Sequence, residues 1–198
     1  MLARAYRAVR GQLGRMRRRT RHLPDRLRHP DRHRRLLDRL ASGPRPREVL
    51  VVCYGNVCRS PYLEAALRRA LPEDVRVRSA GFVGPDRPVP DVSAEVAMRR
   101  GLDLSPHRSQ LLTPDLVRGA DLVLVMDAQQ ADAVQLQFGA RDESVVIVGD
   151  LDPEPAETRG IRDPWGREVE VFESSYTRLD RAASVLARLL TAQHPRVG

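Results

Sequence analysis

Two cysteines and an arginine share one short segment, CYGNVCRSP at residues 53–61, and the chain has no other cysteine. A thiolate is a strong nucleophile, and a guanidinium binds phosphate-like oxyanions through two parallel hydrogen bonds. The apolar run VLVV precedes the segment, and Ser60 and Pro61 at its end predict an N-cap and a first helical residue. Cys53 and Arg59 are therefore predicted to flank a loop between a strand and a helix.

The backbone of this loop favours an anion. Its N–H groups can converge on an oxyanion, and the positive end of the following helix reinforces them. Gly55 permits backbone conformations closed to other residues, and Asn56 tolerates a left-handed conformation. Arg59 would point its guanidinium into the same cradle. A cradle for a phosphate dianion also stabilises a thiolate, so Cys53 is predicted to be an anionic nucleophile at neutral pH.

Other uses of the two thiols fit the sequence less well. A metal site needs further ligands, and no other cysteine or nearby histidine pair supplies them, so neither a metal nor another cofactor is predicted. Redox pairs usually have two residues between their cysteines, whereas four separate Cys53 from Cys58. A nucleotide-type phosphate loop needs a lysine, which the chain lacks. Two buried structural cysteines would leave the loop's glycine, asparagine, arginine and serine unexplained.

Strand and helix patterns alternate around this loop. Apolar runs predict strands at 49–53, 75–82, 121–127 and 144–150, and helical periodicity predicts helices after Ser60 and at 91–102, 114–119, 128–138 and 168–190. The alternation predicts an α/β fold, a doubly wound four-stranded parallel sheet flanked by helices on both faces. Ligands bind such sheets at the carboxyl ends of the strands, where residues 53–60 lie.

Basic residues are concentrated at the N-terminus. Residues 1–47 hold 16 Arg against 3 Asp, whereas the rest of the chain holds 18 Arg against 23 acidic residues. All 34 basic residues are arginine, which indicates a compositional bias. We therefore expect two parts, a basic N-terminal helical extension at 1–47 and a folded domain at 48–198.

Within the extension, apolar residues at helical spacing predict an amphipathic helix over 2–16. Pro24 and Pro30 interrupt the pattern, a second short helix is predicted around 36–40, and SGPRPR at 42–47 is typical of a linker. Such a segment would suit an acidic membrane surface or an acidic partner; the alternative is a solvated extension without a partner. One aromatic residue and no base-reading motif argue against nucleic acid.

The chain has no apolar run of the roughly 18 residues that a membrane-spanning helix needs, and no apolar segment typical of a secretory signal. Its two cysteines do not make a disulfide framework. A cytoplasmic protein is therefore predicted, and the sequence leaves the oligomeric state undetermined.

The segment CYGNVCRSP resembles the C-x-G-N-x-C-R-S-P signature of the low-molecular-weight protein tyrosine phosphatases, a family that shares ancestry with some arsenate reductases. Four further motifs occur in the family's order: SAG at 79–81, HRSQ at 107–110, ADLVLVMD at 120–127 and DPWG at 163–166. The likeness extends from about residue 48 to about residue 190. It implies that residues 48–198 form a phosphatase domain of this type.

The resemblance implies three catalytic residues. Cys53 would attack phosphorus to give a phosphocysteine, and Arg59 would bind the phosphoryl oxygens. Asp163 would protonate the leaving oxygen and then activate water. Asp152, in a second Asp-Pro pair, competes for this last role. Asp163 is favoured because Trp165 follows it, and the family has an aromatic residue there that forms a wall of the cleft.

The resemblance also implies substrate-binding residues, namely Tyr54, Gly55, Asn56, Val57, Cys58, Ser60 and Trp165. The Ser60 hydroxyl would assist the departure of Cys53 as a thiolate. Ser79 and His107 would support the loop together with Asn56. Asp127 resembles an acidic residue of the family near the loop, although at a strand end it equally suits the N-cap of the next helix.

Three loop positions bear on regulation and substrate. Cys58 matches a family cysteine that forms a reversible disulfide with Cys53 and shields it from oxidation; the alternative is a small packing residue. Tyr54 stands where relatives often have Leu or Thr, which would alter substrate choice. Val57 stands where relatives acting on phosphoarginine have Thr, so the resemblance favours the tyrosine-phosphatase subgroup.

The resemblance therefore implies a hydrolase of phosphomonoesters, with a phosphotyrosine-containing protein as the favoured substrate. Protein-arginine phosphatase and arsenate reductase are alternatives on the same scaffold. Arsenate-reducing relatives that couple to thioredoxin use further cysteines, which this chain lacks. A catalytically inactive phosphate- or phosphoprotein-binding module is an alternative of another class, and the presence of Cys53, Arg59 and Asp163 argues against it.

Overall fold

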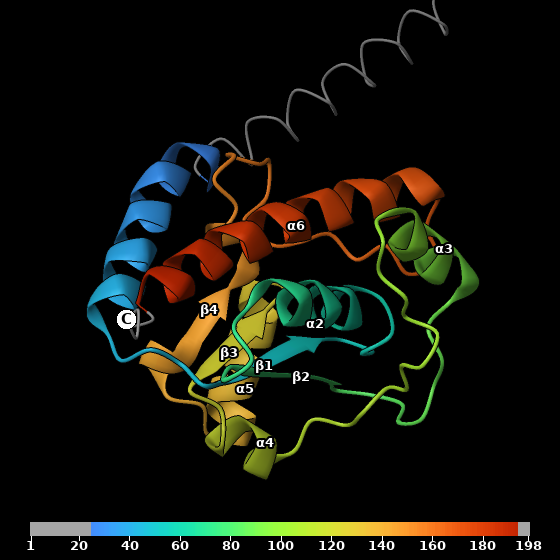
Figure 1. Ribbon diagram of the computed structural model, residues 1–198, viewed down its shortest axis with the longest axis horizontal. Helices are drawn as coiled ribbons and strands as arrows, with labels where there is room; N and C mark the ends of the chain where they lie inside the picture. The colour runs from blue at the N-terminus through green and yellow to red at the C-terminus, as the bar shows by residue number, and fades with distance from the viewer. Residues whose placement is uncertain (1–24, 194–198) are drawn as a thin grey trace, which may run out of the picture.

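The computed structural model describes residues 25–193 (Figure 1). Its centre is one sheet of four parallel strands in the order β2-β1-β3-β4. The strands are β1 (Glu48–Cys53), β2 (Arg76–Gly81), β3 (Leu122–Val125) and β4 (Val145–Ile147). Because β1 is paired on both sides, the loop that follows Cys53 starts in the middle of the sheet's carboxyl edge. The predicted four-stranded parallel sheet is confirmed.

Helices cover both faces of the sheet, as predicted (Figure 1). One face carries α2 (Arg59–Ala70), α3 (Asp91–Arg99) and α6 (Val169–Ala192), and the other carries α4 (Pro114–Arg118) and α5 (Ala128–Phe138). Strand side chains alternate between faces, and β1 shows the result. Val49 and Val51 lie in the core with α2 and α6, whereas Leu50 and Val52 lie in the core with α4 and α5.

β2 is one residue shorter than predicted at each end, and β3 and β4 are shortened further. β4 ends at Ile147, and a 3₁₀ helix, η2 (Val148–Asp150), follows it. A side chain at Gly149 would collide with the carbonyl oxygen of Arg159, so the chain turns where a later loop crosses it. β3 ends at Val125, and the Asp127 side chain accepts a hydrogen bond from the third residue of α5. Asp127 is thus the N-cap of α5.

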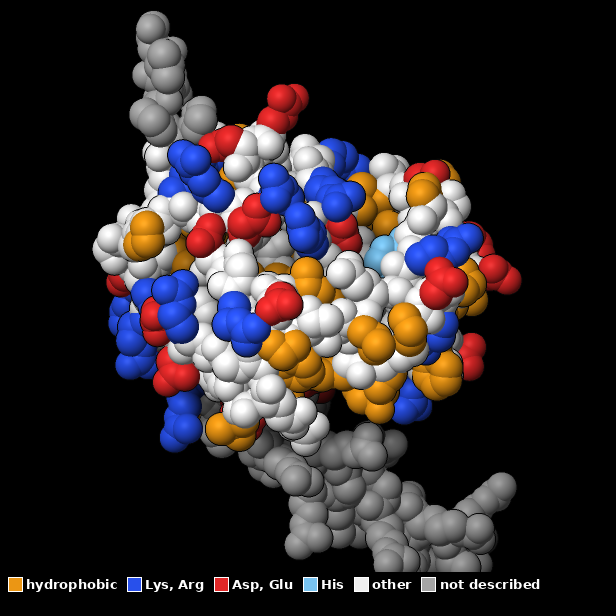
Figure 2. Space-filling view, turned by 90° about the horizontal axis from the view of Figure 1, so that it is seen from below, with side chains coloured by type: hydrophobic (Ala, Val, Ile, Leu, Met, Phe, Trp, Pro, Cys, Tyr) orange, Lys and Arg blue, Asp and Glu red, His pale blue; other side chains and the backbone are white. Residues whose placement is uncertain are grey.

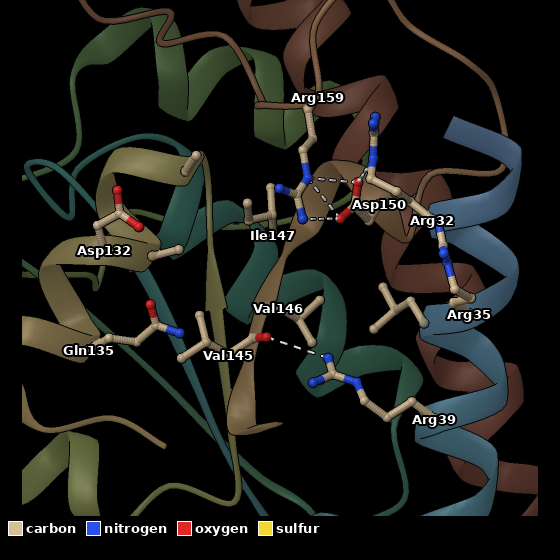
Figure 3. A pocket seen from close by; sticks show the side chains of 13 residues that line it. Arg32, Arg35, Arg39, Asp132, Gln135, Val145, Val146, Ile147, Asp150 and Arg159 are labelled. Atoms are coloured by element: carbon tan, nitrogen blue, oxygen red, sulfur yellow. Dashed lines mark hydrogen bonds and ion pairs between the residues drawn. The ribbon is translucent and has the colours of Figure 1, made fainter. Parts of the chain in front are cut away.

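A helix over residues 25–42 packs against the domain (Figure 1). It passes through Pro30, so the prediction that Pro30 interrupts the helical pattern is wrong. Proline removes one backbone hydrogen bond, but tertiary contacts hold the helix: Leu36 is buried in the core, and Arg39 donates to two carbonyl oxygens in and beside β4. The helix therefore lies beside β4, the edge strand of the sheet (Figure 3). The helix predicted over 2–16 lies outside the described residues.

The segment predicted as a linker is fastened to the domain. Arg45 forms a bidentate pair with Asp74 and also donates to the carbonyl oxygen of Leu190 at 3.1 Å. Gln193, just after α6, donates to the Leu40 carbonyl oxygen at 2.8 Å. Both ends of the helix-to-strand connection are thus tied to the end of α6.

One face of the domain has a mixed surface. Figure 2, seen from the side of α4, shows arginine and acidic side chains interspersed, with hydrophobic side chains between them. This pattern fits the excess of acidic residues after residue 47. No helix within residues 25–193 is both long and apolar enough to cross a membrane.

Candidate active site

The loop after β1 brings a thiol and a guanidinium to the floor of one cavity. Cys53 is the last residue of β1, Arg59 is the first of α2, and their exposed fractions are only 2% and 3%. With Asp163 and Trp165 they line a cavity of about 110 Å³. The structure therefore places the three residues predicted to be catalytic together.

Ser60 contacts the thiol directly. Its hydroxyl donates to Cys53 Sγ over 3.0 Å and accepts a hydrogen bond from Asn56 Nδ2 over 2.9 Å. The prediction that Ser60 is the N-cap of α2 is wrong, because the helix begins at Arg59 and Cys58 precedes it without a side-chain cap. The serine hydroxyl therefore points at the sulfur, next to the cavity.

Asn56 holds the loop in shape. Its φ of 51° is left-handed, as expected for asparagine in a tight loop, and its side chain is fully buried. The amide nitrogen donates to Ser60 and to Ser79 Oγ (2.8 Å), and the amide oxygen accepts from the Gln110 N–H (2.7 Å). His107 Nε2 donates to the Asn56 carbonyl oxygen over 2.8 Å. The predicted support residues, Ser79 and His107, thus meet at Asn56.

The SAG motif at 79–81 has a steric reason. A Cβ on Gly81 would lie 2.7 Å from the backbone nitrogen of Asn56, closer than side chains come to backbone. Ser79, two residues earlier, also donates to the Glu64 carboxylate on α2. The end of β2 therefore packs directly on the loop, and any side chain at Gly81 would displace it.

Arg59 is tied to the segment that carries Asp163. Its Nη2 donates to Asp163 Oδ2 over 2.5 Å, and its Nη1 donates to the Ile161 carbonyl oxygen over 3.0 Å. Its Nε is buried and has no hydrogen-bond partner among the described residues, which leaves a donor for an oxyanion. The backbone N–H of Trp165 donates to Asp163 Oδ1, so both oxygens of this carboxylate accept a hydrogen bond.

Two aromatic side chains flank the cavity. Tyr54 and Trp165 are 59% and 64% exposed, so both offer their rings to a ligand. Val57, which also lines the cavity, is buried and has an apolar side chain. A cavity with polar groups at its floor and aromatic rings at its rim suits an aryl group that ends in an oxyanion.

The two cysteines are free thiols in unequal surroundings. Burial, together with the nearby charges of Cys53 and Asp163, raises the pKa of Cys58 to about 12. Cys58 is therefore a neutral thiol at pH 7. The Tyr176 hydroxyl donates to its carbonyl oxygen over 3.3 Å, which anchors the loop to α6.

Asp152 is excluded from the acid role by its contacts. It is fully buried and accepts hydrogen bonds from Arg178 (2.9 Å) and Arg181 (2.7 Å) on α6. Although burial raises its pKa, the bonds from Arg181 and Arg178 hold that pKa below the ordinary value. Asp152 thus stays ionised in a structural ion pair.

Across residues 25–193, no group of three or more His, Cys, Asp and Glu side chains could hold a metal ion.

Arg87 is a site residue that the sequence did not indicate. Its Nη2 donates to the carbonyl oxygens of Gly55 (2.7 Å) and Val83 (2.9 Å), and its Nε donates to that of Gly84 (2.9 Å). Its side chain also lines the cavity. It lies in a Gly/Pro-rich loop with no motif around it, so only the folded chain reveals that it clamps the nucleophile loop.

Residues 48–196 match the family described as low molecular weight phosphotyrosine protein phosphatase. The chain belongs to this family. A probable low molecular weight protein-tyrosine-phosphatase, EpsP of Ralstonia nicotianae, is 41% identical over 134 residues, which cover 67% of this chain and 88% of EpsP. This match confirms the prediction of an enzyme of the low-molecular-weight phosphatase type.

Solved structures agree with the family assignment. The tyrosine phosphatase AmsI of Erwinia amylovora is 30% identical with a TM-score of 0.67, over 78% of this chain and 97% of AmsI. The YwlE arginine phosphatase of Geobacillus stearothermophilus is 26% identical with a TM-score of 0.68, over 77% of this chain and 98% of YwlE. The family fold thus occurs in enzymes named for two different phosphorylated residues.

The clamp formed by Arg87 leads to a first prediction. Replacing Arg87 by Met should weaken the binding of inorganic phosphate about 3- to 10-fold, because hydrogen bonds to three carbonyl groups and a nearby positive charge are lost. The inhibition constant of phosphate measures the effect. Arg108→Met is the control, since Arg108 is exposed and donates to carbonyl groups within its own loop. Equal inhibition constants for Arg87→Met and the wild type would contradict the role of the clamp.

Proposed function

We propose that the protein hydrolyses phosphotyrosine in protein substrates through a phosphocysteine intermediate on Cys53. The observation that carries the proposal is the convergence of a hydrogen-bonded thiol, a buried guanidinium and a carboxylate on one cavity. Each group has the chemistry that its step requires. The assignments of Cys53, Arg59 and Asp163 as catalytic residues belong to this proposal.

In the first step the Cys53 thiolate attacks phosphorus, the S–P bond forms, and the bond from phosphorus to the tyrosine oxygen breaks. Arg59 binds two phosphoryl oxygens and stabilises the charge that develops on them. The dianion displaces Asp163 from the Arg59 guanidinium, and the released carboxylate takes up a proton from solvent. Asp163 then gives this proton to the leaving oxygen, so the tyrosine departs as a neutral phenol.

In the second step Asp163, now ionised, takes a proton from water, and the water oxygen attacks phosphorus. The S–P bond breaks, and inorganic phosphate is the product. The Ser60 hydroxyl, 3.0 Å from the sulfur, stabilises the departing thiolate. Asn56 keeps the loop backbone in place, so its N–H groups need no reorganisation during either step.

The shape of the site supports an aryl phosphate as substrate. The reactive thiol lies at the floor of the cavity, almost without exposure, and the rings of Tyr54 and Trp165 stand at its rim. A phosphotyrosine ring would stack between such walls while its phosphate reaches the floor. Val57, an apolar wall, offers no hydrogen bond to the guanidinium of a phosphoarginine.

The experiment that tests the proposal compares substrates on one preparation. A phosphotyrosine peptide should have a kcat/KM at least about tenfold above those of matched phosphoarginine and phosphoserine peptides. Only the aryl ring fills the space between the two aromatic side chains at the rim. Release of inorganic phosphate is the measurement. Val57→Thr should raise activity on the phosphoarginine peptide. Faster hydrolysis of phosphoarginine by the wild type would instead support an arginine phosphatase, and no phosphate release would support a binding module.

Three further proposals accompany this function. Arsenate, an analogue of phosphate, would enter the same cradle, and its reduction would require a small external thiol. Cys58 would protect Cys53 by a reversible disulfide under oxidising conditions. A cytoplasmic location fits the two free, buried cysteines.

The basic extension is proposed to bind an acidic membrane surface or an acidic partner. Its charge supports this, with 16 Arg against 3 Asp in residues 1–47. Sedimentation of the protein with vesicles that contain anionic lipid tests whether it binds a membrane surface, and neutral vesicles are the control. Absence of binding to anionic vesicles at low salt would leave only the acidic partner.

A further inference from the structure

Asp150, the last residue of η2, binds two arginines from distant parts of the chain. Its carboxylate accepts hydrogen bonds from Arg159 Nε and Nη2 at 2.9 and 2.7 Å and from Arg32 Nε at 3.2 Å. His33 Nδ1 donates to its carbonyl oxygen over 2.8 Å. Figure 3 shows Asp150 between Arg32 and Arg159 in the wall of a cavity of about 500 Å³. The carboxylate is buried, and the two arginines form ion pairs with it.

Arg32 and Arg159 connect different elements. Arg32 belongs to the helix over 25–42, which lies along β4, and Arg159 belongs to the loop over 151–168 that carries Asp163. Asp150 therefore joins the N-terminal helix to that loop. The family match begins at residue 48, so Arg32 reaches Asp150 from outside the matched part of the chain.

The chain between Arg159 and Asp163 is fixed at several points. The backbone of Arg159 lies so close to Gly149 that no side chain would fit between them. Two residues later, the Ile161 N–H donates to a carbonyl just after β3, and the Ile161 carbonyl accepts from Arg59. Arg159 is thus the first anchored residue of a short segment that ends at Asp163, and loss of its ion pair would loosen the segment from that end.

We propose that Asp150 is a positioning residue through which the helix over 25–42 sets the place of the Asp163 carboxylate. This inference rests on the proposed function, in which Asp163 protonates the leaving oxygen. Arg32 and Arg159 contact neither Asp163 nor the cavity floor. They act by holding Asp150 and the start of the segment that ends at Asp163.

The test compares two aryl phosphates on full-length variants. Phenolate is a strongly basic leaving group that needs its proton from Asp163, whereas p-nitrophenolate is a much weaker base and leaves without one. Arg159→Ala should lower kcat/KM about tenfold for phenyl phosphate and less than about twofold for p-nitrophenyl phosphate. Arg32→Ala should lower the phenyl phosphate value about threefold, again with little change for the nitro ester. Both variants thus lower the ratio of kcat/KM for phenyl phosphate to kcat/KM for p-nitrophenyl phosphate.

The double variant distinguishes a shared path from two separate effects. If Arg32 acts through Asp150 and Arg159, then adding Arg32→Ala to Arg159→Ala leaves the ratio where the single Arg159→Ala variant put it. If the double variant instead changes the ratio by the product of the two single changes, Arg32 affects Asp163 by another route, and the proposal is overturned.

Arg39→Ala is the matched control. Arg39 lies on the same helix and donates to carbonyl oxygens beside β4, but not to Asp150. Its replacement loosens the same helix and should leave the ratio of the two esters unchanged. An unchanged ratio in Arg159→Ala, or equal changes of the ratio in Arg32→Ala and Arg39→Ala, would overturn this inference but not the proposed function. A wild type inactive on both esters would overturn the proposed function, and the inference with it.

Discussion

Replacing Cys53 by Ser should lower kcat by at least about 10⁴-fold while inorganic phosphate still binds. The serine hydroxyl is hardly ionised at neutral pH, and Arg59 cannot make it a nucleophile as it can a thiol. The anion cradle predicted from the sequence consists of backbone N–H groups and Arg59, and the substitution removes neither. Turnover of p-nitrophenyl phosphate measures the first expectation, and titration of the Ser variant with phosphate in a calorimeter measures the second.

Cys58→Ser is the control, because it makes the same change in the same loop. The pKa of Cys58 is about 12, so this thiol is protonated at neutral pH and takes no part as a nucleophile. We expect kcat within about fivefold of the wild-type value, with the difference arising from packing of a buried side chain. Equal loss of activity in the two variants would show that the thiols are not distinct in function. Residual turnover by Cys53→Ser near the wild-type rate would refute the phosphocysteine.

The nucleophile loop was predictable because its parts are contiguous. Cys53, Gly55, Asn56 and Arg59 lie within seven positions, and one strand end and one helix start determine where they point. The local pattern around Ser60 nevertheless predicted an N-cap, whereas the resemblance implied the contact with Cys53 that the structure has. A serine before a proline is typical of an N-cap, but the helix begins at Arg59, two residues before Pro61, with the Arg59 side chain held at the cavity. Only the position of the thiol explains where the hydroxyl points.

The contacts that the sequence missed join distant residues. Arg87 reaches Gly55 across 32 positions, and Arg32 reaches Asp150 across 118. Arginines are frequent in this chain, so no local pattern distinguishes these from exposed ones. The helix through Pro30 illustrates the same limit, because burial of Leu36 outweighs an unfavourable local preference.

Four-strand topology, by contrast, follows from local patterns. Fully apolar runs such as VLVVC require burial on both faces, and such strands in alternation with helices favour a parallel sheet. The ends of β3 and β4 were predicted too late because apolar character continues beyond them. Asp127 must cap α5, and Gly149 must let Arg159 pass, and both demands end the strand earlier than hydrophobicity alone does.

Asp163→Asn should lower kcat/KM for phenyl phosphate about 10²- to 10⁴-fold, the range that a general acid contributes. For p-nitrophenyl phosphate, whose leaving group needs no proton, the loss in kcat/KM should be far smaller. Breakdown of the phosphocysteine also slows, because Asn cannot take the proton from water. A burst of p-nitrophenol followed by slow turnover should therefore appear in rapid-mixing experiments.

The same substitution should strengthen the binding of phosphate or leave it unchanged. Asp163 occupies Arg59 in the unliganded site, so a neutral Asn competes less with an incoming dianion. The inhibition constant of phosphate therefore distinguishes loss of the acid from collapse of the site. A collapsed site would bind phosphate more weakly, whereas a site that lacks only its acid binds phosphate at least as well.

Asp127→Asn is the matched control for the acid role. Asp127 and Asp163 line the same larger cavity beside the active site, and Asn is as good an N-cap as Asp for α5. This variant should keep both the ratio of the two esters and the single-phase release of p-nitrophenol. Asp127→Asn could instead lose activity on phenyl phosphate selectively while Asp163→Asn did not. In that case Asp127, just after β3, would supply the proton, and Asp163 would serve only to hold Arg59 until substrate arrives.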